Sequence, residues 1–288
     1  MIEPTLDETV LAAWIGRSET MSDMIDAAQA RRMLATLDWT GDIDDGDALP
    51  PLWHWIYFLS AARMSDLGRD GHTRLGGFLP PVALPRRMWA GGRFEFHRPI
   101  VIGETITKTS TIDSIAMKHG RSGSLCFVTV RHDLSASDGS ARLSEWHDIV
   151  YREDSEPDAP RPTVPAAPKT PAWSQTITPS STLLFRYSAL TFNGHRIHYD
   201  REYARSVEGY PDLVFHGPLT ATLLADLAVR KARGTLRSFA YRGVTPLFDS
   251  APFTIAGRPS AEAPGTLDLW AATPGGALAM SASATFAA

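Results

Sequence analysis

The sequence predicts an α+β protein of two similar halves, each with one principal helix and a run of antiparallel strands. Apolar residues recur at helical spacing over residues 18–37 and 217–231. Each of these stretches precedes several short segments rich in aromatic and β-branched residues, which are typical of strands. A proline-rich segment separates the two sets, so the same layout is expected twice.

The proline-rich segment, residues 156–171, reads EPDAPRPTVPAAPKTP and almost lacks large apolar side chains. This composition is typical of an extended linker. We therefore expect an N-terminal domain over residues 1–155 and a C-terminal domain over residues 172–288, both within the usual size of a compact domain.

The first half is expected to begin with a helix over residues 18–37, with Ser18 or Ser22 as its N-cap. Trp53, Trp55 and Tyr57 alternate, which favours a strand with these rings on its buried face. Alternation and glycine-containing turns predict strands over residues 53–59, 93–98, 105–115, 124–134 and 142–152.

The second half is expected to contain an irregular segment through Asp200, followed by the helix at 217–231. Its strands are predicted over residues 173–178, 236–244, 252–256, 265–272 and 277–286.

Composition limits the class of protein. The formal net charge of −4 and the absence of basic tracts argue against nucleic-acid binding. No run of 18 apolar residues and no signal peptide are found, so a membrane location is not expected. The single cysteine, Cys126, lies in an apolar run, is expected to be inert, and fits a cytoplasmic protein.

Residues 186–216 carry most of the candidate chemistry, because they combine three histidines, an asparagine and several aromatic residues without a long apolar period. Such a segment favours a site loop over a core element. It ends at His216, where Gly217 and Pro218 open the predicted helix. The first amides of a helix are unpaired donors, so Gly217 is a candidate oxyanion-hole residue.

The stretch TFNGHRIHYD, residues 191–200, resembles the hydratase motif of MaoC-like (R)-specific enoyl-thioester hydratases, and His198 falls on the catalytic histidine of that family. HGPL at residues 216–219 resembles the start of the family's central helix. Residues 76–104 and 187–200 look like the subgroup of mesaconyl-C4-CoA (3-methylfumaryl-CoA) hydratases and type 2 3-hydroxyacyl-thioester dehydratases. The resemblance implies a double hot-dog fold, in which each antiparallel sheet wraps around a central helix and a degenerate N-terminal half completes the acyl pocket.

One position departs from the family pattern, because Asn193 occupies the place of the family's catalytic aspartate. An amide cannot remove a proton near neutral pH, so Asn193 is expected only to orient water or the thioester. His198 would then carry the proton transfer alone, as an imidazole can. No metal or redox cofactor is expected; His195 and His198 are three residues apart but lack a third ligand at a recognised spacing.

Several further residues are candidates for the substrate pocket. Arg86 and Arg87 suit a CoA phosphate or a substrate carboxylate, although they could also form a solvated turn. Trp89, Tyr199 and His216 are assigned to the same pocket, and His216 is also expected to shape the start of the helix. Asp200 is expected to be an N-cap or to orient a neighbour.

The resemblance implies an acyl-CoA hydratase that converts mesaconyl-C4-CoA, or a similar branched C5 dicarboxylyl-CoA, to citramalyl-CoA or its equivalent. The alternative within the same chemistry is a type 2 3-hydroxyacyl-thioester dehydratase of fatty-acid synthesis. Two other classes stay open: a hot-dog thioesterase, which would need a carboxylate near the helix, and a noncatalytic acyl-binding module. Exposed sheet edges in hot-dogs also suggest a homodimer.

Overall fold

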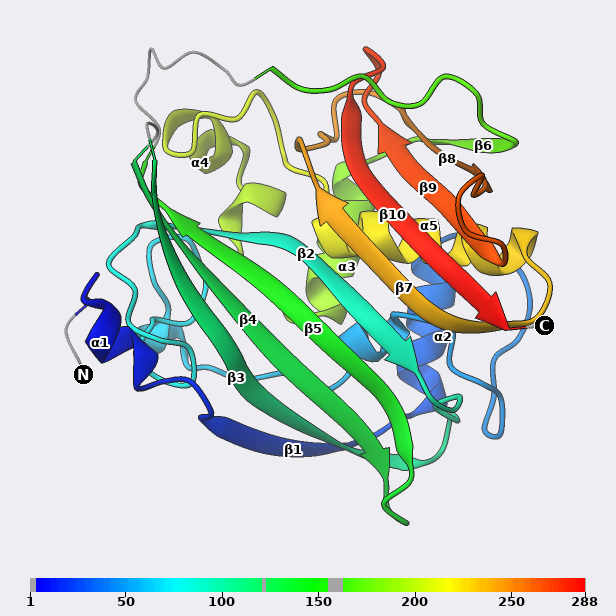
Figure 1. The fold of residues 1–288 in the computed structure, drawn as a ribbon, viewed down its shortest axis with the longest axis horizontal. Coiled ribbons are helices and arrows are strands. Elements are labelled where there is room, and N and C mark those ends of the chain that lie inside the picture. The colour runs from blue at the N-terminus through cyan, green and yellow to red at the C-terminus, as the bar shows by residue number, and fades with distance from the viewer. Residues whose placement is uncertain (1–3, 121–122, 155–162, 288) are drawn as a thin grey trace.

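The fold is a single ten-stranded antiparallel sheet with helices packed on one face (Figure 1). The computed structural model describes residues 4–120, 123–154 and 163–287. The strand order is β1-β3-β4-β5-β2-β7-β10-β9-β8-β6, so the first five strands of the chain form one side of the sheet and the last five form the other. The strands are β1 (Ser18–Met24), β2 (Arg86–Phe96), β3 (Thr105–Gly120), β4 (Gly123–Ala136), β5 (Ala141–Arg152), β6 (Trp173–Ile177), β7 (Thr235–Gly243), β8 (Phe253–Pro259), β9 (Thr266–Ala272) and β10 (Leu278–Ala287).

Strands β2 and β7 join the two halves of the sheet, with Phe94 opposite Phe239 in the register. Gly91 permits this pairing, because a Cβ atom at that position would lie 2.6 Å from the carbonyl oxygen of Tyr241. Both phenylalanines are buried in the largest apolar cluster, which contains residues from both halves. The two halves therefore share one sheet and one core.

Helix α5 (Gly217–Lys231) is the central helix of the C-terminal half and crosses behind β9 and β10 in Figure 1. Nearly every side chain from Leu219 to Ala228 is buried, as expected of a helix that the sheet wraps around. The other helices are α1 (Glu8–Ala12), α2 (Ala27–Thr36), α3 (Ser181–Leu190) and α4 (Arg201–Ser206), with 3₁₀ turns η1 (Trp53–Ile56), η2 (Met64–Asp66) and η3 (Arg196–His198).

Three predicted elements were wrong. Residues 18–24 form the edge strand β1 on β3, and the helix begins later, at the N-cap Asp26. The expected strand at 53–59 is the 3₁₀ turn η1, in which the adjacent His54 and Trp55 both bond Glu145. Successive side chains of a strand point to opposite faces, so a strand could not make that contact.

The segment expected to be irregular contains helix α3, which was the third wrong assignment. The hydroxyl of Ser180 accepts a hydrogen bond from Leu183 N at 3.1 Å and caps the helix. Leu184, Tyr187 and Ser188 are buried at helical spacing. Packing of α3 against α2 supplies the partner surface that a local pattern does not show.

Only part of the proline-rich segment can be compared with the linker prediction, because residues 156–162 lie outside the described residues. Residues 165–167 run alongside the β9–β10 turn, with bonds from Leu278 N to Pro165 O and from Ala167 N to Gly276 O. The described end of this segment is therefore docked on the C-terminal half.

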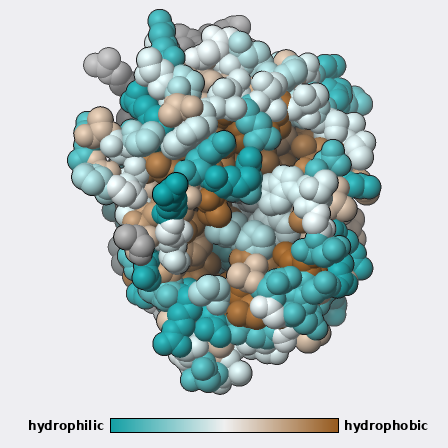
Figure 2. Space-filling model, turned by 90° about the vertical axis from the view of Figure 1, so that its right-hand side faces the viewer, coloured by the Kyte–Doolittle hydropathy of each residue, from teal (hydrophilic) through white to brown (hydrophobic). Residues whose placement is uncertain are grey.

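Figure 2 shows the side of the molecule on which β6, β8 and the end of α5 lie, with apolar patches inside a largely hydrophilic surface. Among the described residues, no helix combines the length and the apolar character needed to cross a bilayer.

Candidate active site

His198 is held at the end of η3 with one ring nitrogen committed to the backbone. Its Nδ1 donates to the carbonyl oxygen of Val214 at 2.7 Å, so in the neutral ring Nε2 carries the lone pair. Burial lowers the pKa of His198 to about 4, even though the bond to Val214 opposes this shift. The side chain is therefore a neutral base at neutral pH with a fixed tautomer, and its Nε2 has no hydrogen-bond partner among the described residues.

His216 places this base in front of helix α5. The two imidazoles stack with ring centroids 3.7 Å apart and planes 19° apart, and the Nε2 atom of His216 is 2.9 Å from the Ser188 hydroxyl. His216 is the N-cap residue of α5, and intrahelical bonding begins with Thr220 N to His216 O. The amide of Gly217 is thus one of the first-turn donors without an intrahelical acceptor. An added Cβ at Gly217 would meet no atom within 4 Å, so open space adjoins it.

The loop before His198 is organised by side-chain contacts to the backbone. The Asn193 side-chain oxygen accepts a hydrogen bond from His195 N at 3.0 Å, and Tyr199, whose side chain is half exposed, donates its hydroxyl to Gly194 O at 3.0 Å. Asp200 caps α4 through Tyr203 N, which confirms its predicted N-cap role. The side-chain oxygen of Asn193 therefore accepts a hydrogen bond within the turn, and its NH₂ group remains a donor.

A loop from the N-terminal half docks directly on the hydratase motif. The amide of Arg196 donates to Asp70 O at 2.9 Å, and an ideal Cβ at Gly71 would lie 2.0 Å from Gly194 O. Next to this contact, His72 Nδ1 donates to Asp70 Oδ2 at 2.8 Å. The His72 ring lies 4.2 Å from that of His195, so a second histidine–carboxylate pair borders the site.

The predicted cationic residues differ in their surroundings. Arg86 is buried and forms an ion pair with Glu208 at 2.9 Å, which links strand β2 to the segment after α4. Arg87 is half-buried, and its positive charge adds to burial in lowering the pKa of His195. Trp89 shares the face of β2 with Arg87 and contacts the rings of Trp55 and His147. Arg87 is therefore a cation whose charge acts on His72 and His195.

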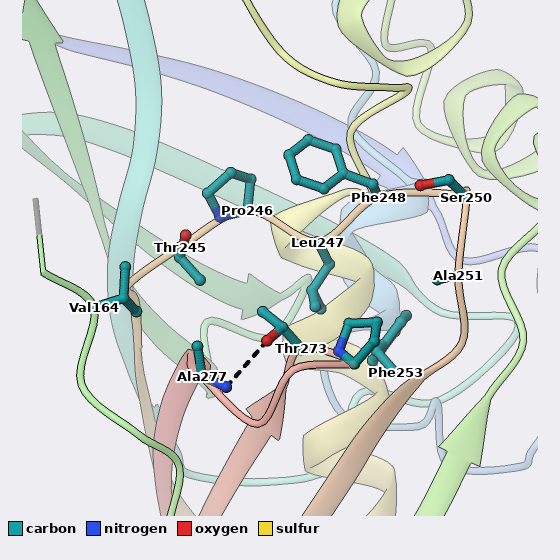
Figure 3. A pocket seen from close by; sticks show the side chains of 11 residues that line it. Val164, Thr245, Pro246, Leu247, Phe248, Ser250, Ala251, Phe253, Thr273 and Ala277 are labelled. Carbon is teal, nitrogen blue, oxygen red and sulfur yellow. Dashed lines mark hydrogen bonds between the residues drawn. The ribbon is translucent and has the colours of Figure 1, made fainter. Parts of the chain in front are cut away.

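One apolar cavity of about 240 Å³ lies apart from these groups (Figure 3). Leu247, Phe253 and Pro246 contribute to its lining, and a hydrogen bond from Ala277 N to Thr273 Oγ1 closes the turn beneath it. The segment 213–215 separates the cavity from His198, because Val214 N bonds Ile197 on one side while Phe215 N bonds Leu247 on the other. None of the predicted site residues lines it.

Comparison with known proteins identifies the family. The family model for hydroxyacyl-thioester dehydratase type 2 matches residues 52–249. The chain belongs to this family. It is 48% identical over 272 residues to a mesaconyl-C(4)-CoA hydratase from Chloroflexus aurantiacus, covering 94% of this chain and 95% of that protein.

Solved structures confirm the double hot-dog α+β fold. A MaoC-like dehydratase from Phytophthora capsici aligns with a TM-score of 0.71 at 15% identity, covering 96% of each chain. A Mycobacterium tuberculosis protein described as a double hotdog fold aligns with a TM-score of 0.55 at 14% identity, covering 94% of this chain and 96% of that chain. As a member of the type 2 family, the chain is a hydro-lyase of the hydratase/dehydratase type.

Asp70 and His72 border the candidate site but were not predicted from the sequence. Their signal was weak: an Asp-Gly-His triplet in a polar, glycine-rich stretch, more than 120 positions before the motif that it contacts. A positive φ of 87° at Gly71 makes the triplet turn sharply, which only the folded chain reveals.

Proposed function

We propose that this chain adds water reversibly to the double bond of mesaconyl-C4-CoA, or of a similar branched C5 dicarboxylyl-CoA, and forms citramalyl-CoA or its equivalent. The 48% identity to a protein named as a mesaconyl-C(4)-CoA hydratase, over nearly the whole length of both chains, supports the substrate class. The double hot-dog fold and the histidine at position 198 support the reaction type.

One observation carries the proposal: the ring of a neutral His198, whose Nδ1 bonds the backbone, stacks on His216, the N-cap of α5. In the hydration direction, His198 takes a proton from water while the water oxygen bonds the β-carbon. The π electrons move toward the thioester oxygen, where the Gly217 amide and the helix dipole stabilise the negative charge. The α-carbon then receives a proton, so one water is added in total.

Arg87 fits the second charged end of the substrate. Its guanidinium is close enough to Asp70, His72 and His195 to shift the pKa of each. A planar cation of this kind binds a carboxylate through two parallel hydrogen bonds. Arg86 stays with Glu208 in this proposal and supports the fold of the pocket wall.

A type 2 3-hydroxyacyl-thioester dehydratase is the second candidate, and the match to the family model of that description favours it. The chemistry would be the same run in reverse, without a substrate carboxylate. A cation beside the histidines disfavours a purely apolar acyl chain at that position, because the charge would lose hydration without gaining a partner.

The remaining expectations belong to the same proposal. The reaction needs no cofactor beyond the CoA of its substrate, and a cytoplasmic location agrees with a single, fully buried Cys126. The sheet ends at β1 and β6, so a homodimer could pair or cover these edges.

The test is an assay of the purified protein with mesaconyl-C4-CoA, crotonyl-CoA and a long-chain enoyl-CoA. It follows loss of enoyl-thioester absorbance and product mass for the wild type and for His198→Ala. A gain of one water that disappears in the variant, with mesaconyl-C4-CoA preferred, supports the proposal. Preference for the long chain selects the dehydratase. Release of free CoA, or no turnover on all three, rejects both hydration functions in favour of the thioesterase or the binding module.

A further inference from the structure

We propose that His72, oriented by Asp70, is the second proton-transfer residue of this active site and takes the role of the carboxylate that is absent at Asn193. The inference rests on the proposed hydratase function. It assigns a catalytic group to the N-terminal half of the chain, on the loop between η2 and β2.

The first argument is that this loop is fixed to the hydratase motif by its backbone. Three contacts cross the two loops: Arg196 N to Asp70 O at 2.9 Å, the Arg196 guanidinium to Arg69 O at 3.2 Å, and the close approach of Gly71 to Gly194. Catalytic groups must be held within a fraction of an ångström of their working geometry. Here backbone contacts hold the N-terminal loop against the motif.

The second argument is the internal geometry of the pair. Asp70 uses both carboxylate oxygens on His72: Oδ1 accepts the backbone N–H at 3.0 Å, and Oδ2 accepts Nδ1–H at 2.8 Å. This fixes the ring and its tautomer and leaves Nε2 with the lone pair. A carboxylate in this position also stabilises the imidazolium that forms when Nε2 takes a proton.

The third argument is the alignment of four imidazoles. The ring centroids of His72 and His195 are 4.2 Å apart, those of His195 and His198 are 5.4 Å apart, and those of His198 and His216 are 3.7 Å apart. The His72 side chain is 27% exposed and His195 is half-buried, whereas His198 is 7% exposed and His216 is fully buried. The series therefore leads from solvent to the start of α5.

The positive charge of Arg87 favours this proposal over a metal site. Asp70, His72 and His195 each offer a ligand atom within 4.8 Å of the others, which is a donor set that a metal ion could use. However, Arg87 adds a smaller lowering of the pKa of all three groups to the larger effects of burial and of the neighbouring side chains, so a positive charge already acts on this cluster. A nearby guanidinium opposes a second cation and favours an anion, such as a substrate carboxylate or a developing enolate.

The groups facing His72 include acids and bases, and they have opposite effects on its pKa. Burial lowers the pKa of His72 and Arg87 lowers it further, whereas Asp70 and Glu208 raise it. Burial alone would raise the pKa of Asp70, but His72 and Arg87 outweigh this effect and keep the carboxylate ionised. The pair thus combines a permanent negative charge with a ring that can change its protonation state.

The proposed step balances in both directions. In dehydration, His72 Nε2 removes the α-proton, the C–H electrons form the double bond, and protonated His198 gives its proton to the departing hydroxyl. In hydration, His198 takes a proton from water, and protonated His72 gives its proton to the α-carbon. Each cycle leaves a proton on one histidine that must return to the other, and His195 lies between them.

The experiment compares His72→Ala, Asp70→Asn and the matched control His97→Ala, an exposed residue directly after β2 whose ring bonds Ser144. We expect His72→Ala to lower kcat by about 10²- to 10⁴-fold with a smaller change in KM, as for loss of a general acid–base group. Added imidazole should restore part of the activity to this variant only, and Asp70→Asn should shift the pH–rate profile. In His72→Ala, exchange of the product α-proton in D₂O should slow together with kcat.

The outcomes separate the two levels of the proposal. If the wild-type protein hydrates none of the three enoyl-CoA substrates, the proposed function fails and this inference falls with it. If the wild type is active but His72→Ala matches His97→Ala in kcat and pH profile, only the role of His72 is rejected. Loss of wild-type activity after dialysis against a chelator, with recovery on adding Zn²⁺, would instead assign the cluster to a metal and overturn the inference.

Discussion

The imidazole of His198 stacks on that of His216 with ring centroids 3.7 Å apart. This contact connects the hydratase motif to the first turn of α5, because His216 immediately precedes Gly217. Burial is the largest cause of a lowered pKa for both rings, so both are neutral at neutral pH and stack without charge repulsion. One pair of side chains therefore positions the proposed base and the proposed oxyanion donor.

The pH dependence of hydration should reflect this neutral base. Since only unprotonated His198 can accept a proton from water, kcat/KM should fall as the pH decreases through about 4, the pKa that burial gives this residue. The same lowered pKa weakens the fold as the pH falls from about 6.5 toward that value, because the unfolded imidazole binds the proton more readily.

This prediction is checked by initial rates across the pH range, with circular dichroism at each pH to separate inactivation from unfolding. An acidic limb near the ordinary pKa of histidine, with the fold intact, would contradict the assignment of His198 as a buried neutral base.

Replacing His216 should affect activity more than replacing its hydrogen-bond partner. His216→Ala removes the stacked ring, and we expect kcat to fall by about 10²-fold through misplacement of His198. Ser188→Ala removes the 2.9 Å contact to His216 Nε2 but leaves the ring in place, so it serves as the matched control. Both variants should lose about 1–3 kcal/mol of unfolding free energy, because each leaves a buried polar atom unpaired. Equal losses of kcat in the two would show that the stack does not position the base.

The sequence predicted the C-terminal part of the site because its signals are local. Pro218 marks the first turn of a helix, and the spacing from Asn193 to His198 carries the family motif in consecutive residues. The structure stacks His198 on His216, the residue before Gly217, and α5 was predicted with its observed bounds.

The N-terminal contributions could not be predicted in the same way because they depend on contacts between distant segments. His54 and Trp55 do not form the expected strand, and both bond Glu145. Residues 18–24 do not form part of the expected helix but pair with β3. Asp70 and its loop contact the motif in the folded chain, in which β2 and β7 join the two halves. Propensity and periodicity contain no information about such partners.

Glu145 should contribute strongly to stability at neutral pH. It is 3% exposed and accepts hydrogen bonds from His54 Nε2 at 2.8 Å and Trp55 Nε1 at 2.9 Å. Glu145→Gln leaves His54 buried without its charged partner, so we expect a loss of about 3–5 kcal/mol in unfolding free energy. Urea denaturation measures this loss, and Glu95→Gln, an exposed change on β2, is the control.

The difference between wild type and Glu145→Gln should narrow in acid. Burial alone would raise the pKa of Glu145, but the bond to His54 outweighs it and brings the pKa to about 2. A lowered carboxyl pKa stabilises the fold above the unfolded pKa, and this contribution disappears as the pH falls toward the folded value. A difference that stayed constant from neutral pH into acid would contradict the role of the ionised carboxylate.

Arg87 should determine preference for a substrate that carries a second carboxylate. In Arg87→Met, kcat/KM for mesaconyl-C4-CoA should fall by about 10²-fold or more, as for truncation of one partner of a buried charge pair. The loss on crotonyl-CoA should be smaller, because that substrate has no carboxylate to bind. The measured quantity is the ratio of the two kcat/KM values, and an unchanged ratio would exclude Arg87 from substrate selection.

The close approach of Gly71 to Gly194 should make a single added methyl group disruptive. Gly71 has φ +87°, and its ideal Cβ would lie 2.0 Å from Gly194 O. Gly71→Ala therefore combines backbone strain of about 1–2 kcal/mol with a collision that separates the N-terminal loop from the motif. We expect lower stability together with a loss of kcat, since His72 and His195 no longer keep their relative positions.

Gly139→Ala separates these two effects. Gly139 has a similar φ of +79° in the β4–β5 turn, and no atom lies within 4 Å of its ideal Cβ, so this variant experiences the backbone strain without the collision. Thermal unfolding and kcat are measured for both variants. If the two loops are docked, the backbone strain should destabilise both variants to a similar extent. Gly71→Ala should lose additional stability, and kcat should fall in Gly71→Ala alone. If Gly71→Ala retained the kcat of Gly139→Ala, the N-terminal loop would not position the catalytic residues, and its contact with Gly194 would serve stability only.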